Sequence, residues 1–139
     1  MKRFFEINMK LLRLAYIIGF VLLISCSGQP TKLSGKTETI EVSHVNWACD
    51  CADFIETKFF RENANYEIKE EDCIFIEAAN TDNIIPDNYY DETHFKYYLK
   101  LTGQFYEEKG IPGSYDRKTP ERPGKAKVFR YDNFELIEK

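Results

Sequence analysis

A strict two-residue alternation between positions 95 and 106 limits the fold of this chain more than any other pattern in its sequence. One face of the segment carries Phe95, Tyr97, Leu99, Leu101, Gly103 and Phe105, and the other carries mostly polar residues and tyrosines. Because successive side chains of a strand point to opposite faces, the segment predicts a long strand with one buried face. Gly103 lies inside it, where a missing side chain permits a bend or a close backbone approach.

The C-terminal segment, Lys125 to Ile137, predicts a second long strand. Phe129 and Tyr131 share one face, and the phase of the pattern changes near Asp132-Asn133. The preceding segment, 110–124, contains three prolines and three glycines, which is typical of a long loop.

The N-terminal part of the domain predicts shorter elements. Thr37 to Trp47 has a strand pattern with a phase slip, for which we expect a β-bulge near Ser43-His44. Residues 52–63 fit a short helix, capped by Asp53, or an irregular segment. Cys73 to Ala79 predicts a short strand, and residues 80–92 a polar connector.

Long strands that bend are how small barrels close without an exposed edge. The segment Tyr98 to Phe105, with its aliphatic-Thr-Gly sequence, resembles a curved strand of oligonucleotide/oligosaccharide-binding (OB) folds, and Val128 to Ile137 resembles the bent strand that follows it. The resemblance covers positions 95–139 and implies a mainly β, five-stranded OB-like barrel. A small β-sandwich is the alternative, because the same strands could build one.

The first 26 residues carry an export signal. Four basic residues precede or flank an uncharged run of eleven residues, Leu14 to Ile24. Such a run spans about 16 Å as a helix, roughly half of a bilayer core, so it fits a signal peptide better than a membrane span. Met9 is an alternative start to Met1, because a complete leader still follows it.

The leader ends in Leu23-Ile24-Ser25-Cys26, which resembles the lipobox of bacterial lipoproteins. The resemblance implies cleavage before Cys26, lipid on its sulfur and an acyl chain such as palmitate on the new amino terminus. We therefore expect a membrane-anchored lipoprotein of the cell envelope. Ser27 at the next position favours the outer membrane, facing the periplasm. The alternatives are an uncleaved anchor and a fortuitous cysteine.

The expected organisation is a signal peptide at 1–25, a flexible tether at 26–36 and one globular domain at 37–139. The leader holds four of the 19 basic and one of the 23 acidic residues, which leaves 15 and 22 and a net charge of about −7 for the mature chain. Such a charge repels phosphate backbones, so we expect no nucleic-acid partner.

Three cysteines remain in the domain: Cys49, Cys51 and Cys73. In an oxidising compartment we expect one disulfide, joining Cys73 to Cys49 or Cys51, because a bridge between Cys49 and Cys51 closes a very small ring. The alternative is a zinc or copper site formed by the three thiols with His44 or His94. No Cys-x-x-Cys motif supports a thiol oxidoreductase.

No motif in the chain indicates catalysis. It has no nucleophile elbow, phosphate loop or zinc-protease helix, and its histidines are isolated in the sequence. The acidic runs around residues 70–72 and 87–92 are typical of a solvated face. We therefore expect no cofactor and a non-enzymatic role in binding an envelope protein or a glycan, or in supporting the envelope. The alternative is a metal-, redox- or glycan-binding domain that uses the cysteines or surface aromatics such as Tyr98 and Tyr106, which more simply cover the barrel.

Overall fold

The computed structural model of the protein describes residues 28–139, so the expected signal peptide and the expected lipidation site at Cys26 lie outside the described residues. The strands are β1 (Glu38–His44), β2 (Phe54–Glu56), β3 (Ile74–Ala78), β4 (Tyr97–Phe105) and β5 (Lys127–Glu138). The helices are short: α2 (Lys58–Arg61), α3 (Asp87–Asp91), and the 3₁₀ helices η1 (Glu70–Asp72), η2 (Thr81–Asn83) and η3 (Thr93–Phe95).

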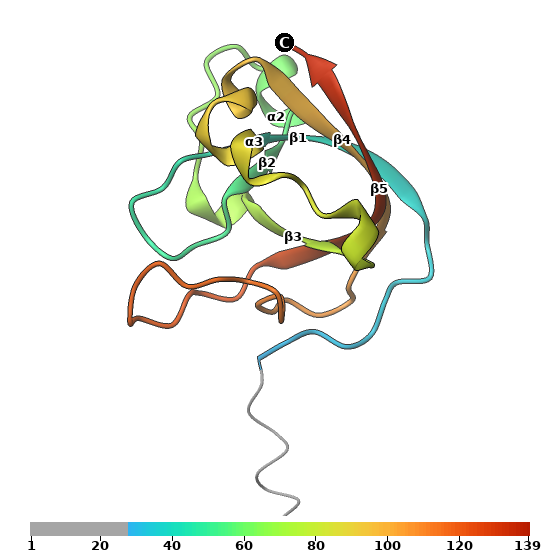
Figure 1. The fold of residues 1–139 in the computed structure, drawn as a ribbon. Helices are drawn as coiled ribbons and strands as arrows, with labels where there is room; N and C mark the ends of the chain where they lie inside the picture. The colour runs from blue at the N-terminus through green and yellow to red at the C-terminus, as the bar shows by residue number, and fades with distance from the viewer. Residues whose placement is uncertain (1–27) are drawn as a thin grey trace, which may run out of the picture.

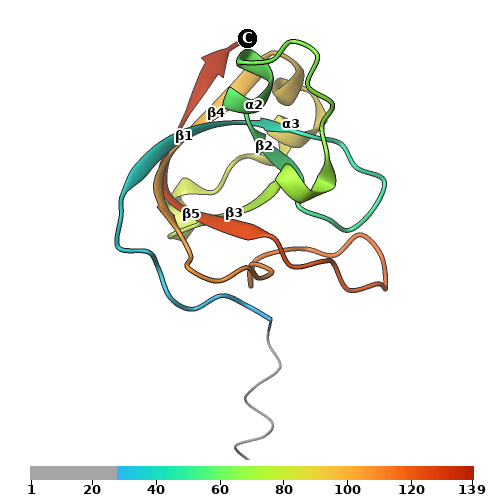
Figure 2. The same cartoon turned by 180° about the vertical axis from the view of Figure 1, so that it is seen from behind.

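The five strands form a closed barrel in the order β1-β2-β3-β5-β4 (Figures 1 and 2). All neighbouring strands are antiparallel except β3 and β5, which are parallel. The expected mainly β, OB-like barrel is thereby confirmed, and the alternative β-sandwich is wrong. Closure leaves no unpaired strand edge, and it depends on the bending of the two longest strands.

The bend lies where β4 and β5 meet. The register shifts between Thr102, which pairs with Asn133, and Gly103, which pairs with Tyr131, so that Asp132 is the extra residue of a bulge. A Cβ on Gly103 would lie 2.1 Å from the Arg130 carbonyl oxygen. The interior glycine and the phase change at Asp132-Asn133, both visible in the sequence, therefore belong to the same β-bulge.

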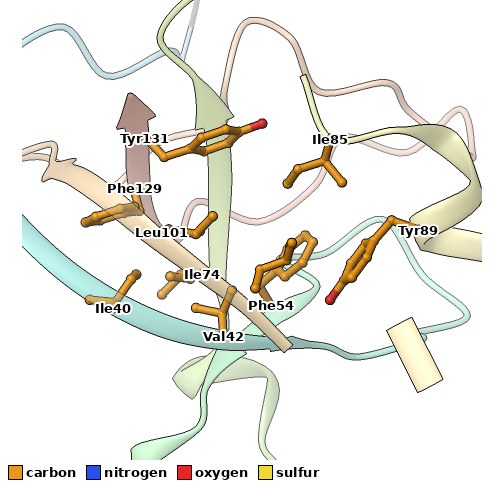
Figure 3. Packing of buried hydrophobic residues seen from close by; sticks show 10 residues of the cluster. Ile40, Val42, Phe54, Ile74, Ile85, Tyr89, Leu101, Phe129 and Tyr131 are labelled. Carbon is orange, nitrogen blue, oxygen red and sulfur yellow. The ribbon is translucent and has the colours of Figure 1, made fainter. Parts of the chain in front are cut away.

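The barrel interior is filled by residues of alternate positions on every strand. Ile40 and Val42 of β1 meet Leu99 and Leu101 of β4 there, as the alternation of β4 predicts. The connector between β3 and β4 covers one end of this core with Ile85 and Tyr89, which lie beside Phe54 in Figure 3.

A second apolar cluster lies on the outer face of the β2, β3 and β5 wall. It is formed by Ala52, Ile55, Cys73, Phe75 and Val128, against which Trp47, Phe59, Tyr106 and Tyr115 pack. The segments 45–53, 57–72 and 106–126 therefore cover this wall of the barrel. Burial on both faces stabilises strands as short as β2.

Three expectations from the sequence, for the end of β1, for Asp53 and for Phe95, are wrong. Strand β1 ends at His44 and pairs with β2 without a register shift, so the expected bulge at Ser43-His44 is absent and the pattern slips because the strand ends. Asp53 does not cap a helix: β2 follows it, and α2 begins after Thr57 without a side-chain cap. Phe95 is not on the buried face of a strand, because it lies in η3 and is 70% exposed.

The expected tether is also different in its described part. The Ile111 N–H donates to the Gly28 carbonyl, Glu107 N–H to Lys32, and Ser34 N–H to Phe105. Lys32 further forms an ion pair with Glu107 at 2.7 Å. Backbone hydrogen bonds of residues 28, 32 and 34 thus tie this segment, seen in blue and cyan in Figure 1, to the end of β4 and to the residues that follow it.

Between residues 28 and 139, no helix has both the length and the apolar character that a membrane crossing needs.

Candidate functional site

A cavity of about 640 Å³ opens between the end of β1, the connector after β3 and the loop between β4 and β5. Its wall combines five aromatic residues with four aspartates and one lysine. The aromatic residues are Phe54, Phe75, Tyr90, Tyr115 and Tyr131, and the charged residues are Asp53, Asp87, Asp91, Asp116 and Lys118. We call it the aromatic–acidic pocket. Of two smaller pockets, one of about 540 Å³ is lined by four lysines and two glutamates among other residues, and one of about 360 Å³, which includes two arginines and two prolines, shares Tyr115 with the aromatic–acidic pocket.

His44 and Asp53 lie together in the wall of the pocket because β1 and β2 form an antiparallel pair. His44 is opposite Phe54, which places Asp53 beside it, and His44 Nε2 lies 3.6 Å from an Asp53 carboxylate oxygen. Their side chains are only 7% and 14% exposed. Lys118 Nζ approaches the same oxygen at 3.9 Å. The half-buried Asp53 carboxylate therefore has two neighbours, the His44 imidazole and the positively charged Lys118 ammonium.

The two histidines, far apart in the sequence, meet in space. The ring centroids of His44 and His94 are 5.0 Å apart, and Phe54 and Tyr90 also contact the His44 ring. His94 is buried and its Nδ1 lies 3.2 Å from the Tyr89 carbonyl oxygen. The sequence contains no signal for this contact, because it depends on how the connector folds across the end of the barrel.

The His44–Asp53 pair has the form of a base and its orienting acid, and Ser114 lines the same pocket, but no hydroxyl or thiol of residues 28–139 is hydrogen-bonded to His44 Nδ1. His44 Nδ1 is buried without a hydrogen-bond partner, and Asp53 occupies the other nitrogen. A general base needs its free nitrogen within reach of the proton that it removes. In this structure the pair holds the His44 ring in the wall of the pocket with its Nδ1 unpartnered.

Asp50 holds the loop that closes one side of the pocket. Its carboxylate accepts hydrogen bonds from the Lys118 N–H at 2.8 Å, the Thr119 N–H at 2.6 Å and the Tyr115 hydroxyl at 3.2 Å, and also from the Thr119 hydroxyl. The hydrogen bond from the Thr119 side chain is the largest cause that lowers the pKa of Asp50 from 3.8 to about 2. One carboxylate thus ties the 45–53 segment to the 106–126 loop. The two segments extend on the same side of the barrel in Figures 1 and 2.

The disulfide differs from the expected one. Cys49 and Cys51, the residues on either side of Asp50, are bonded to each other, with Cα atoms 5.7 Å apart. They lie in a bend and not in a strand, so their side chains can turn toward each other across Asp50. The expected bridge from Cys73 to Cys49 or Cys51 is therefore wrong.

Cys73 is a free, buried thiol that belongs to the outer apolar cluster. Its Sγ is directed to the Lys69 carbonyl oxygen at 3.5 Å, and burial raises the pKa of this thiol. A buried thiol with a raised pKa is chemically inert, so its role here is packing.

The expected alternative metal set, His44, Cys49, Cys51 and Cys73, is not assembled among residues 28–139. The group that does come together is Cys49, Cys51 and Glu70, whose ligand atoms lie within 4.8 Å of one another. With the two sulfurs bonded to each other, they do not offer the thiolates that zinc or copper binds.

The surface aromatics named from the sequence lie away from the pocket and cover the barrel. Tyr98 packs between the Arg61 guanidinium and the Lys139 ammonium. The Tyr106 hydroxyl donates to Glu77, and its ring packs on the outer apolar cluster. The aromatic rings of the pocket come instead from segments whose sequence pattern carries no binding motif.

Comparison with known proteins gives no match. No family model fits the sequence, and no curated protein and no solved structure is significantly similar to it.

Proposed function

We propose that this chain is a lipid-anchored lipoprotein of the bacterial cell envelope, attached through Cys26, whose barrel is a non-enzymatic glycan-binding domain. The observation that carries the proposal is the aromatic–acidic pocket, in which aromatic side chains and carboxylates line one cavity and the Tyr90 side chain is exposed. In OB folds the loop between the first two strands and the loop between the last two form ligand sites. Here the corresponding segments are 45–53 and 106–126, and both contribute to the pocket.

The chemistry of the lining selects the ligand class. Aromatic faces provide apolar contact for the C–H faces of a sugar ring, and carboxylates accept hydrogen bonds from hydroxyls and pair with amino groups. Four aspartates stand against one lysine, so uronic, sulfated or phosphorylated chains are repelled. The pocket therefore favours a neutral or amino-bearing glycan, and the outer-membrane location suggested by Ser27 would face it toward the periplasm.

The test is isothermal titration calorimetry of the full chain in detergent with chitosan oligosaccharides, cello-oligosaccharides and oligogalacturonate. We expect binding of the amino-bearing chain, weaker binding of the neutral chain and none of the acidic chain. Tyr90→Ala removes an exposed ring of the pocket and should weaken binding about tenfold.

Tyr98→Ala is the matched control, because Tyr98 is also a partly exposed tyrosine but lies on the barrel wall between Arg61 and Lys139. It should leave the affinity unchanged. Equal affinity of the Tyr90→Ala variant and the unchanged chain, or preference for the acidic oligosaccharide, would exclude this pocket as the glycan site.

A further inference from the structure

We propose that the Cys49–Cys51 disulfide is a thiol–disulfide exchange site, and that its reduction by an external dithiol releases the loop that closes the aromatic–acidic pocket. The proposal rests on three observations: the bond between these two residues, the position of Asp50 between them, and the contacts of Asp50 with the pocket loop. Release of the loop does not depend on the function proposed above. Only the change in glycan affinity that this release would cause rests on that function.

The position of the disulfide in the chain makes it a poor staple for the barrel. It joins residues separated by two positions, and the stabilisation that a crosslink gives through chain entropy falls as the closed loop shortens. It connects no two strands, since both cysteines lie in the segment between β1 and β2. Its effect is therefore local, on the backbone around Asp50.

The two cysteines differ in exposure. Cys49 is exposed, whereas Cys51 is 2% exposed. Exposed disulfides are the ones open to exchange, and the attacking group is a thiolate. An incoming thiolate therefore attacks Cys49, and Cys51 is the leaving sulfur.

The exchange is balanced by a dithiol. Its first thiolate forms a bond with Cys49 Sγ while the Cys49–Cys51 bond breaks, and Cys51 leaves as a thiolate that takes up a proton. The second thiol of the reagent, as its thiolate, then attacks the mixed disulfide, which frees Cys49 as a thiolate that is protonated in turn. The protein gains two electrons and two protons, and the dithiol becomes a cyclic disulfide.

The link to the pocket is Asp50. Its carboxylate accepts from the backbone N–H groups of Lys118 and Thr119 and from the Tyr115 hydroxyl, and Tyr115 and Lys118 both line the pocket. In the oxidised chain the small ring restricts the backbone on both sides of Asp50. Reduction restores that conformational freedom, so holding the carboxylate in place becomes costly and the loop loses its fixed partner.

The experiment is hydrogen exchange of the full chain in detergent, with and without excess dithiothreitol, after alkylation and mass mapping have established which cysteines are reduced. Reduction should speed exchange at the Lys118 and Thr119 amides about tenfold, the effect of losing one hydrogen bond to a charged acceptor. Amides inside β4 should not change, which separates release of the loop from unfolding.

Three variants sharpen the result. The double variant Cys49→Ser, Cys51→Ser should exchange fast at both amides without reductant and show no further response to it. Asp50→Asn should also speed exchange while its disulfide remains intact. Cys73→Ser, which removes the buried thiol, should retain the full response to reductant.

A disulfide that dithiothreitol reduces only after denaturation, or exchange at Lys118 and Thr119 that is the same in both redox states, would overturn the proposal. Because the exchange measurement needs no glycan, failure of glycan binding with an intact redox response would count against the proposed function alone. Conversely, glycan binding at Tyr90 with no redox response would count against this inference alone.

Discussion

At the scale of single residues, Asp50 shows how one carboxylate organises two segments that are distant in the sequence. It is buried and accepts hydrogen bonds from residues 115, 118 and 119. A carboxylate with several N–H and O–H donors is stabilised in its charged form, which is why its pKa is lowered to about 2. The flanking cysteines fix its backbone, so the short sequence Cys49-Asp50-Cys51 acts as one unit.

The lowered pKa of Asp50 predicts an acid transition of the pocket loop. The group stabilises the folded state fully above its unfolded value of 3.8, and this contribution is lost as the pH falls through about 2. We expect hydrogen exchange at Lys118 and Thr119, relative to that within β4, to become faster between these two values. Asp50→Asn should show fast exchange throughout and lack this transition, whereas an identical pH profile in both chains would contradict the assignment.

At the scale of elements, the pairing of β4 with β5 decides the shape of the barrel. Gly103 lies opposite the bulge at Asp132. The Asp132 carbonyl oxygen accepts a hydrogen bond from the Asn83 side chain. A bulge increases local twist and bend, and closure of five strands requires both. Tyr131, the residue before the bulge, lies in the barrel interior and at the edge of the pocket.

Gly103→Val should destabilise the barrel strongly. A Cβ at this position would lie 2.1 Å from the Arg130 carbonyl oxygen and 2.6 Å from Tyr131 Cα, both of which are backbone atoms that cannot move without separating β5 from β4. We expect a loss of about 3 kcal/mol in the free energy of unfolding, measured by denaturant titration. Gly124→Ala is the matched control, because nothing lies within 4 Å of a Cβ there. Equal unfolding midpoints for the two variants would remove the argument from close approach.

At the scale of the whole molecule, the described N-terminal segment fixes where the chain enters the barrel. Gly28 is hydrogen-bonded to Ile111, and two residues of extended chain span only about 7 Å. A lipid on Cys26 would therefore hold this end of the barrel close to the bilayer. If the proposed lipid is attached there, the segment 28–36 would orient the domain as well as connect it to the membrane.

Cys26→Ala should release the protein from membranes. Several acyl chains anchor a protein firmly whereas one is marginal, and the net charge of about −7 outside the leader gives no attraction to anionic lipids. The measurement is the fraction that sediments with membranes after a high-salt wash. Cys73→Ala serves as the control that retains the anchor, and sedimentation of the Cys26→Ala chain would exclude lipid attachment as the means of membrane association.

The sequence by itself determined the features that repeat along the chain. The alternation of β4, the phase change at Asp132-Asn133 and the composition of the 110–124 loop predicted long bent strands and hence the barrel, because strand periodicity is a local property. Tertiary structure alone decided the order of the strands, the end of β1 at His44 and the contact between His44 and His94. It also decided that Cys49 bonds to Cys51 and that Asp50 holds the pocket loop, since these contacts join residues whose neighbours in sequence carry no sign of the partner. The pocket belongs to this second group because closing the barrel brings its connectors together. Burial of the core stabilises that closure, and Phe54, Ile85 and Tyr131 belong both to the core and to the lining of the pocket.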